Sequence, residues 1–150
     1  MYQSILVPVD GSTHAEKALA VAAQLARASS ARLHLVTVTE FPPDNIGLFL
    51  GGTAEPFSQE QRDKLASEMK QEGRQVIEKA RSSVDLSGLD VEEHIFQGWP
   101  AKRIVDHAES LGADAIVMGS RGLSDVRGMV FGSVSHRVSH TARCTVITVT

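Results

Sequence analysis

Short β-rich runs alternate with helical patterns along the whole chain, and this alternation constrains the fold more than any other feature. The first run, residues 5–9, is continuously apolar, which suits a strand buried on both faces of a parallel sheet. Pro8 cannot donate a backbone hydrogen bond, so it should lie at the end of that strand. Four further strands are expected at residues 33–38, 91–96, 115–118 and 145–149.

Helical patterns fill the intervals between these runs. Thr13 and Glu16 have the spacing of a capping box at the start of the first pattern. Pro100 is tolerated in the first turn of a helix, and Gly112 is a typical residue to end one. This order predicts an α/β fold, a parallel sheet with helices on both faces. The helices are expected at residues 15–28, 61–84 and 100–111, and in a short segment that begins near Ser133.

Composition and charge narrow the class of protein. The 150 residues are 42% hydrophobic and 22% charged, as in an ordinary globular protein, so we expect one domain over residues 1–150. The net charge of −3 includes no basic block, which argues against nucleic acid as a partner. Cys144 is the single cysteine and cannot form an internal disulfide. The apolar run at residues 5–9 is too short for a signal peptide or a membrane span, so we expect a cytoplasmic protein with no membrane partner.

Two strand ends carry residues suited to a nucleotide. In open parallel sheets, ligands bind at the carboxyl ends of strands, where the strand order reverses. Residues 10–12 (Asp-Gly-Ser) follow the first strand, and residues 119–122 (Gly-Ser-Arg-Gly) follow the fourth. Glycines at these ends allow a ligand to approach the backbone closely.

A Gly-Ser pair, residues 132–133, follows after nine further residues. Gly132 again allows close approach, and Ser133 is a good N-cap residue for the last helix. The amides at a helix start carry partial positive charge and make a natural phosphate site. Arg121 and Arg127 add positive charge nearby, so the whole spacing predicts a site for phosphate groups.

Three segments, residues 5–12, 113–122 and 132–135, read ILVPVDGS, ADAIVMGSRG and GSVS. With these segments in this order, nearly the whole chain resembles the universal stress protein family, specifically its ATP-binding branch. The least typical parts are Thr145, where the family often has proline after the cysteine, and residues 41–57. The latter segment is irregular, and either a solvent loop or a lid would explain it.

The resemblance implies a five-stranded parallel sheet in the order 3-2-1-4-5, of the Rossmann-like, adenine nucleotide α-hydrolase-like type. That order places the switch point between the first and fourth strands. The ligand would be ATP, with cyclic AMP as an alternative. A Mg or Mn ion would bridge the phosphates and Asp10 or waters. No set of protein ligands alone predicts a metal site.

The same resemblance implies the ATP contacts. Asp10 would hold the ribose, and the backbone of Val38 would contact the adenine edge. The other expected contacts are Pro8 and Val9 beside the adenine, Gly119, Gly122, Gly132, Ser133 and Ser135 at the phosphates, Met118 and Arg121 flanking them, and Ser12 and Val134 in the same site.

An enzyme on the same scaffold, either a dedicated ATPase or an adenylate-transferring enzyme, is the main alternative. The P-loop pattern Gly-x-x-x-x-Gly-Lys-Ser/Thr is absent from the sequence, and no residue stands out as a base that would activate water. We therefore expect ATP binding with at most slow hydrolysis. A nucleotide-free dimer module is a third interpretation, which the intact glycine spacing argues against. His136 and His140, four residues apart, are expected as ordinary surface histidines.

The fifth strand predicts a partner. Residues 145–150 are β-branched, uncharged and free of proline, and the implied strand order puts them at the edge of the sheet. An exposed edge of this kind invites pairing with another chain, so we expect a homodimer through the fifth strand. Alternatively, the last helix or residues 41–57 cover the edge.

Overall fold

Five strands form one parallel sheet in the computed structural model, which describes residues 1–40, 58–123 and 131–150. The strand order is β3-β2-β1-β4-β5, so the predicted fold and order are confirmed. The predicted strand bounds differ from the observed ones by one residue at most. The strands are β1 (Ser4–Pro8), β2 (Arg32–Thr39), β3 (Val91–Gln97), β4 (Ala115–Gly119) and β5 (Thr145–Val149).

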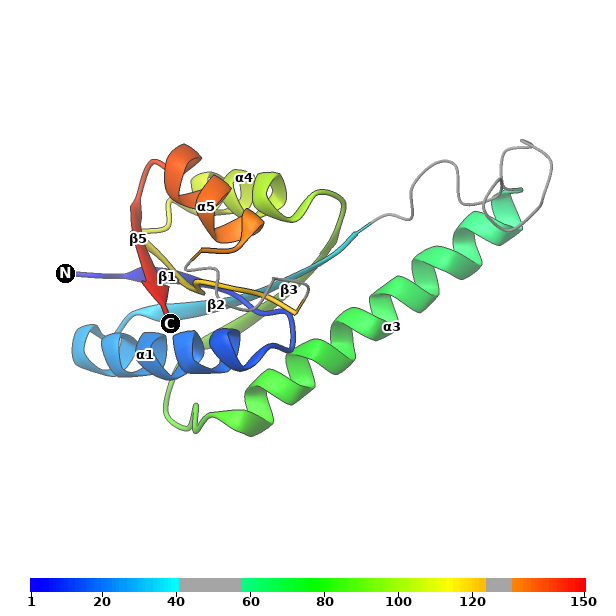
Figure 1. Ribbon diagram of the computed structural model, residues 1–150. Helices are drawn as coiled ribbons and strands as arrows, with labels where there is room; N and C mark the ends of the chain where they lie inside the picture. The colour runs from blue at the N-terminus through cyan, green and yellow to red at the C-terminus, as the bar shows by residue number, and fades with distance from the viewer. Residues whose placement is uncertain (41–57, 124–130) are drawn as a thin grey trace.

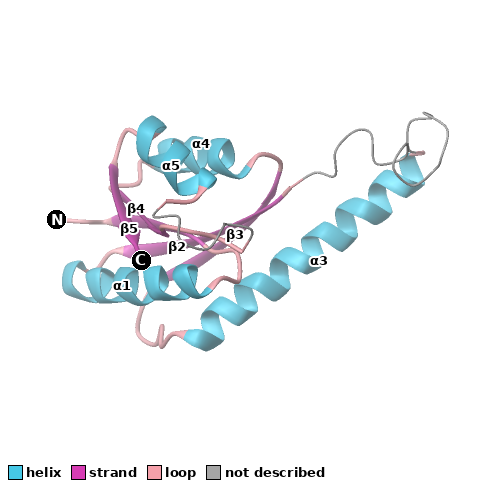
Figure 2. Ribbon diagram, in the orientation of Figure 1, coloured by secondary structure: helices cyan, strands magenta, loops and turns pink. Residues whose placement is uncertain are grey.

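Helices cover both faces of this sheet (Figures 1 and 2). One pair of helices, α1 and α3, lies on one face, and the other pair, α4 and α5, lies on the opposite face. The helix α3 is the longest and extends past the sheet (Figure 1). The bounds are α1 (Thr13–Ser29), α3 (Gln59–Ser83), α4 (Pro100–Leu111) and α5 (Ser133–Thr141).

The helix ends correct two details of the sequence prediction. Ser12, not Thr13, caps α1, because its hydroxyl accepts a hydrogen bond from the backbone N–H of Ala15 at 3.2 Å. Gly132, not Ser133, is the N-cap of α5, and Ser133 is the first helical residue. As predicted, Gly112 ends α4, in the left-handed conformation that glycine adopts without strain.

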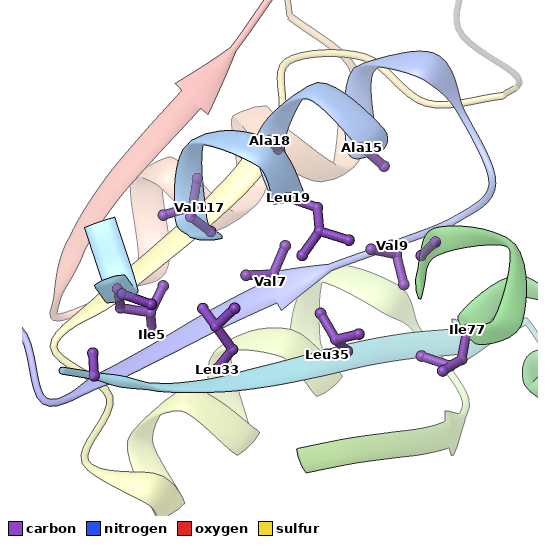
Figure 3. Packing of buried hydrophobic residues seen from close by; sticks show 14 residues of the cluster. Ile5, Val7, Val9, Ala15, Ala18, Leu19, Leu33, Leu35, Ile77 and Val117 are labelled. Atoms are coloured by element: carbon purple, nitrogen blue, oxygen red, sulfur yellow. The ribbon is translucent and has the colours of Figure 1, made fainter. Parts of the chain in front are cut away.

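The core follows the two-residue period of the strands. Ile5, Val7 and Val9 point toward α1 and α3, where alanines such as Ala18 let the helix approach the sheet closely (Figure 3). Leu6 points to the other face and packs in the cluster that α4 and α5 cover. Because β1 and β4 are apolar on both faces, the middle of the sheet is buried between two helical layers.

A glycine sets the position of α3 over β2 and β3. A Cβ at Gly73 would lie 2.6 Å from Cγ2 of Ile95 and 3.3 Å from Cγ2 of Thr37. Only a residue without a side chain allows the helix to come this close. This contact brings the middle of α3 beside the carboxyl end of β2.

No helix in the described ranges, 1–40, 58–123 and 131–150, is both long enough and apolar enough to span a membrane. The irregular segment at residues 41–57 lies outside these ranges.

Asp114 ties together the amino end of the sheet. Its carboxylate accepts hydrogen bonds from the backbone N–H groups of Gln3 at 2.7 Å and Ser4 at 2.9 Å. Its own backbone N–H donates to the carbonyl of Ser4, and its carbonyl accepts from the N–H of Thr145. The hydrogen bonds from Gln3 and Ser4 lower the pKa of the Asp114 carboxyl below its ordinary value.

Replacing Asp114 by alanine should lower the melting temperature at pH 7, because two amides at the start of β1 lose their acceptor. Since the folded-state pKa is lowered, the carboxylate stabilises the protein above the unfolded pKa of about 3.9 and loses this effect as the pH falls through its folded pKa. The difference between wild type and Asp114→Ala should therefore narrow in acid. Asp106→Ala, which removes an exposed carboxylate that pairs with Lys102 on the same helix, is the control. Equal melting temperatures at pH 7 would contradict this role.

Candidate functional site

A cavity of about 420 Å³ opens at the carboxyl ends of β1, β2 and β4. Its size is within the range that small-molecule sites occupy. Its walls come from both helical layers: α3 supplies Glu72 and Val76, α4 supplies Pro100 and Ile104, and α5 supplies its first turn. The cavity therefore lies at the switch point between β1 and β4, where the sequence predicted a site.

Most of the residues predicted to contact a nucleotide line this cavity. The exceptions are Ser12, which is buried as the cap of α1, and Gly132, which caps α5. Arg127 lies outside the described residues. The predicted residues that line the cavity are Pro8, Val9, Asp10, Val38, Met118, Gly119, Arg121, Gly122, Ser133, Val134 and Ser135.

The turn after β1 orients Asp10. One carboxylate oxygen of Asp10 accepts a hydrogen bond from the N–H of Ser12 at 2.9 Å, while the hydroxyl of Ser12 caps α1. Lys79 of α3 donates to the carbonyl of Gly11 at 2.7 Å and so holds the turn from the other side. Asp10 is exposed and lies at the cavity wall, so its carboxylate is available to a ligand that carries hydroxyl groups.

Gly119 allows β4 to end against the start of α1. A Cβ at this position would lie 2.8 Å from the carbonyl carbon of His14 and 3.0 Å from the backbone nitrogen of Ala15. These are backbone atoms that cannot move without shifting α1. The glycine predicted for close approach of a ligand is therefore also required for packing between two elements.

Hydrogen bonds to Ser120, here called the clasp, join the two ends of the glycine-rich segment, residues 119–133. The carbonyl of Ser120 accepts from the N–H of Gly132 at 2.5 Å and from the hydroxyl of Ser135 at 2.7 Å. The N–H of Ser120 donates to the carbonyl of Val149 at 2.8 Å, which connects the clasp to β5. The Ser135 hydroxyl, predicted at the phosphates, thus donates to the backbone in this structure. The clasp places the start of α5 at the cavity wall.

The start of α5 gives the cavity its positive end. Gly132 provides no side chain to cap the helix, so the first amides of α5 receive no side-chain hydrogen bond there. Amides in this position attract anions such as phosphate. Arg121 adds a guanidinium at the same wall, and its Nε donates to Nε2 of His14 at 3.1 Å.

Apolar side chains form another part of the cavity wall, and this surface suits a flat apolar ring such as an aromatic base. Sequence reasoning missed its contributions from α3 and α4, because they depend on how these helices pack over the sheet. The helix expected at residues 61–84 gave no sign that Val76 meets the strand ends. The apolar wall consists of Val9, Val36, Val38, Val76, Ile104 and Met118.

A second cluster of polar side chains lies outside the cavity wall, between β2, β3 and α4. The cluster contains Glu92 and three histidines, of which His34 is buried. Burial lowers the pKa of the His34 and His107 imidazoles, so both are neutral at neutral pH. The sequence did not predict that His34 and His94 lie close together, because it does not show the register between β2 and β3.

Comparisons with known proteins agree with this architecture. The sequence profile described as the Universal stress protein family matches residues 1–150. The universal stress protein YxiE of Bacillus subtilis is 34% identical over 149 residues, which cover 99% of both chains.

Two similar solved structures contain adenine nucleotides. A universal stress protein in complex with cAMP shares 27% identity at a TM-score of 0.62, over 99% of this chain and 96% of that one. A universal stress protein from Archaeoglobus fulgidus in complex with dAMP also shares 27% identity, at a TM-score of 0.60, over 99% and 98% of the two chains.

Replacing Gly119 by alanine should destabilise the protein by about 1–3 kcal/mol, because the added methyl group overlaps the backbone of α1. Chemical denaturation followed by circular dichroism measures this change. Gln24→Ala alters an exposed position on the same helix and should change stability by no more than about 0.5 kcal/mol. If Gly119→Ala matched the wild type, the close contact between β4 and α1 would be wrong.

Proposed function

This chain belongs to the universal stress protein family, and on that premise we propose that it binds ATP in the cavity at the carboxyl end of its sheet. The main support for this proposal is that the cavity has an apolar part and a positively charged part. One part of its wall is apolar, and another part is the start of α5, with Arg121 beside it. A nucleotide has the same two ends, a flat base and a charged phosphate chain.

The residues can be assigned to the parts of the nucleotide. Val9 and Val38 would lie against the adenine, together with Pro8. Asp10 would accept hydrogen bonds from the ribose hydroxyls, because the Ser12 N–H orients its carboxylate at the cavity wall. The phosphates would lie at the start of α5, beside Gly119 and Gly122, with Ser133, Val134 and Ser135 in the first turn.

A divalent cation would accompany the phosphates. Mg or Mn prefers oxygen ligands and commonly binds through substrate phosphates and one or two carboxylates. Asp10 is the carboxylate predicted for this role, and Glu40 and Glu72 line the same cavity. The relatives that contain cAMP and dAMP support an adenine nucleotide as the ligand class.

We propose binding with slow hydrolysis at most, in a cytoplasmic protein. A lysine that reaches the terminal phosphates is a regular part of P-loop ATPases. Among the described residues that line the cavity there is no lysine. The nucleotide would then act as a signal that the protein holds, in keeping with a role in the stress response.

Titration calorimetry with ATP and Mg²⁺ should show one site per chain. Gly132→Val should weaken ATP binding by about tenfold or more, because a branched side chain at the N-cap crowds the phosphates, and such a loss corresponds to about 1.4 kcal/mol. Ala66→Val adds the same kind of bulk on an exposed face of α3 and should not alter the affinity. Phosphate release, followed in the same samples, should stay well below the typical enzyme rate of about 10 per second.

Equal ATP affinity in wild type and Gly132→Val would contradict the site. Competition by cyclic AMP at lower concentration than ATP would instead assign the same cavity to the cyclic nucleotide. Turnover at ordinary enzyme rates would place the protein among the enzymes.

We also propose that the chain forms a homodimer through β5. This strand is at the edge of the sheet, as the strand order requires, and is only half-buried from Val146 to Val149. An unpaired edge without charge pairs readily with a second copy about a two-fold axis. The resulting interface would cover the apolar side chains of β5.

Ile147→Lys should shift the protein from dimer to monomer in light scattering at micromolar concentration, because the ammonium group would lose water on association. Circular dichroism must show that the variant is folded, since Ile147 also packs beside the core under α1. Gln75→Lys adds the same charge to an exposed position on α3 and should leave the dimer intact. A monomeric wild type, or a dimer that tolerates Ile147→Lys, would count against this interface.

A further inference from the structure

Three potential metal ligands meet at the β3 edge of the sheet. His34 of β2 and Glu92 of β3 are directly paired in the parallel register, and His94 follows Glu92 on the same face. One ligand atom from each of His34, Glu92 and His94 lies within 4.8 Å of the others. His34 is about 60 positions from the other two residues in the chain, so the pairing of β2 with β3 creates the cluster.

The distances between the ligand atoms fit one tetrahedral ion. Nδ1 of His34 and Nε2 of His94 are 3.2 Å apart. Two imidazole nitrogens bound to Zn²⁺ at about 2.0–2.1 Å lie about 3.3 Å from each other in tetrahedral geometry. The Oε2 atom of Glu92 is 3.6 Å from Nδ1 of His34, and its Oε1 atom is 3.8 Å from Nε2 of His94. A hydrogen bond between two neutral imidazoles would explain the first distance but not the convergence of the carboxylate.

The surroundings of the cluster leave a path by which an ion can enter and leave Glu92 able to bind it. The side chains of His34, His94 and Glu92 are 6%, 15% and 50% exposed, so the ligands lead from solvent at the sheet edge into the core. Arg32 lies 3.9 Å from Glu92 but forms its closer ion pair, at 2.6 Å, with Asp90. Glu92 can therefore bind an ion while Arg32 keeps its ion pair with Asp90.

A third histidine adjoins the cluster from α4. The ring centroids of His107 and His94 are 4.3 Å apart. Nε2 of His107 is buried and has no hydrogen-bond partner among the described residues. A buried nitrogen without a partner calls for an occupant such as water or an ion. The ring that carries this nitrogen packs against His94, one of the three ligands.

We propose that His34, Glu92 and His94 bind one divalent cation of the first transition row, for which zinc is the natural probe, with His107 beside the site. Imidazole and a single carboxylate suit zinc, whereas Mg²⁺ and Ca²⁺ prefer sets of oxygen ligands. None of these four residues lines the nucleotide cavity, so the cation is distinct from the Mg or Mn ion that would accompany ATP. The bound cation would link the edge strand β3 to β2 and so stabilise the sheet under α4.

Zinc titration of the full chain tests this site. The sample should be prepared without a polyhistidine tag and without nucleotide. Bound metal is first removed with a chelator, and the chelator is then removed. Competition against a chromophoric zinc indicator should give one zinc ion per chain. His94→Ala should weaken binding by about tenfold or more, since even outer-sphere partners of metal ligands cost that much. Zinc should also raise the melting temperature of the wild type.

Two further variants make the result unambiguous. Glu92→Gln keeps the shape of a half-exposed side chain, so it should remain folded while it weakens zinc binding. The double variant of His136 and His140 to alanine removes the exposed histidine pair on α5, whose rings are 4.4 Å apart, and should bind zinc as the wild type does. Absence of zinc binding in the micromolar range would overturn the proposal. Loss of zinc binding only in the His136 and His140 variant would overturn it as well.

Discussion

The contact between β1 and β4 is the constraint on which the rest of the structure depends. The chain leaves β1 through α1 toward β2 and leaves β4 through α5 toward β5, so the connections depart to opposite sides of the sheet. Right-handed crossovers then place α1 and α5 on opposite faces. The cavity lies at the carboxyl ends of these two strands, between the starts of the two helices.

Short contacts maintain this opening. Gly119 lets the end of β4 touch the first turn of α1, and the Ser120 carbonyl draws the start of α5 back to the same strand end. The two helix starts thereby reach one site from opposite faces of the sheet. Any residue larger than glycine at position 119 would separate α1 from β4, so the same backbone geometry serves both packing and the site.

Pattern and spacing predicted the regular elements well, because a sheet buried on both faces requires apolar strands and helices with one apolar stripe. The caps were less predictable. Ser12 and Thr13 are adjacent cap-forming residues, and only the chain direction after β1 decides that Ser12 accepts the Ala15 N–H. Gly132 and Ser133 present the same ambiguity at α5. The residues that α3 adds to the cavity depend on the contact of Gly73 with Ile95, and the histidine cluster depends on strand register. A single sequence shows neither this helix contact nor the strand register.

If the cavity binds an adenine nucleotide, both the base and the phosphates must lie in it. A crystal structure of the protein with a non-hydrolysable ATP analogue and Mg²⁺ is the decisive test. We expect the adenine against Val9 and Val38, the ribose hydroxyls at Asp10, and the phosphates at the first amides of α5. An analogue bound elsewhere on the molecule, or one whose phosphates point away from α5, would contradict this expectation.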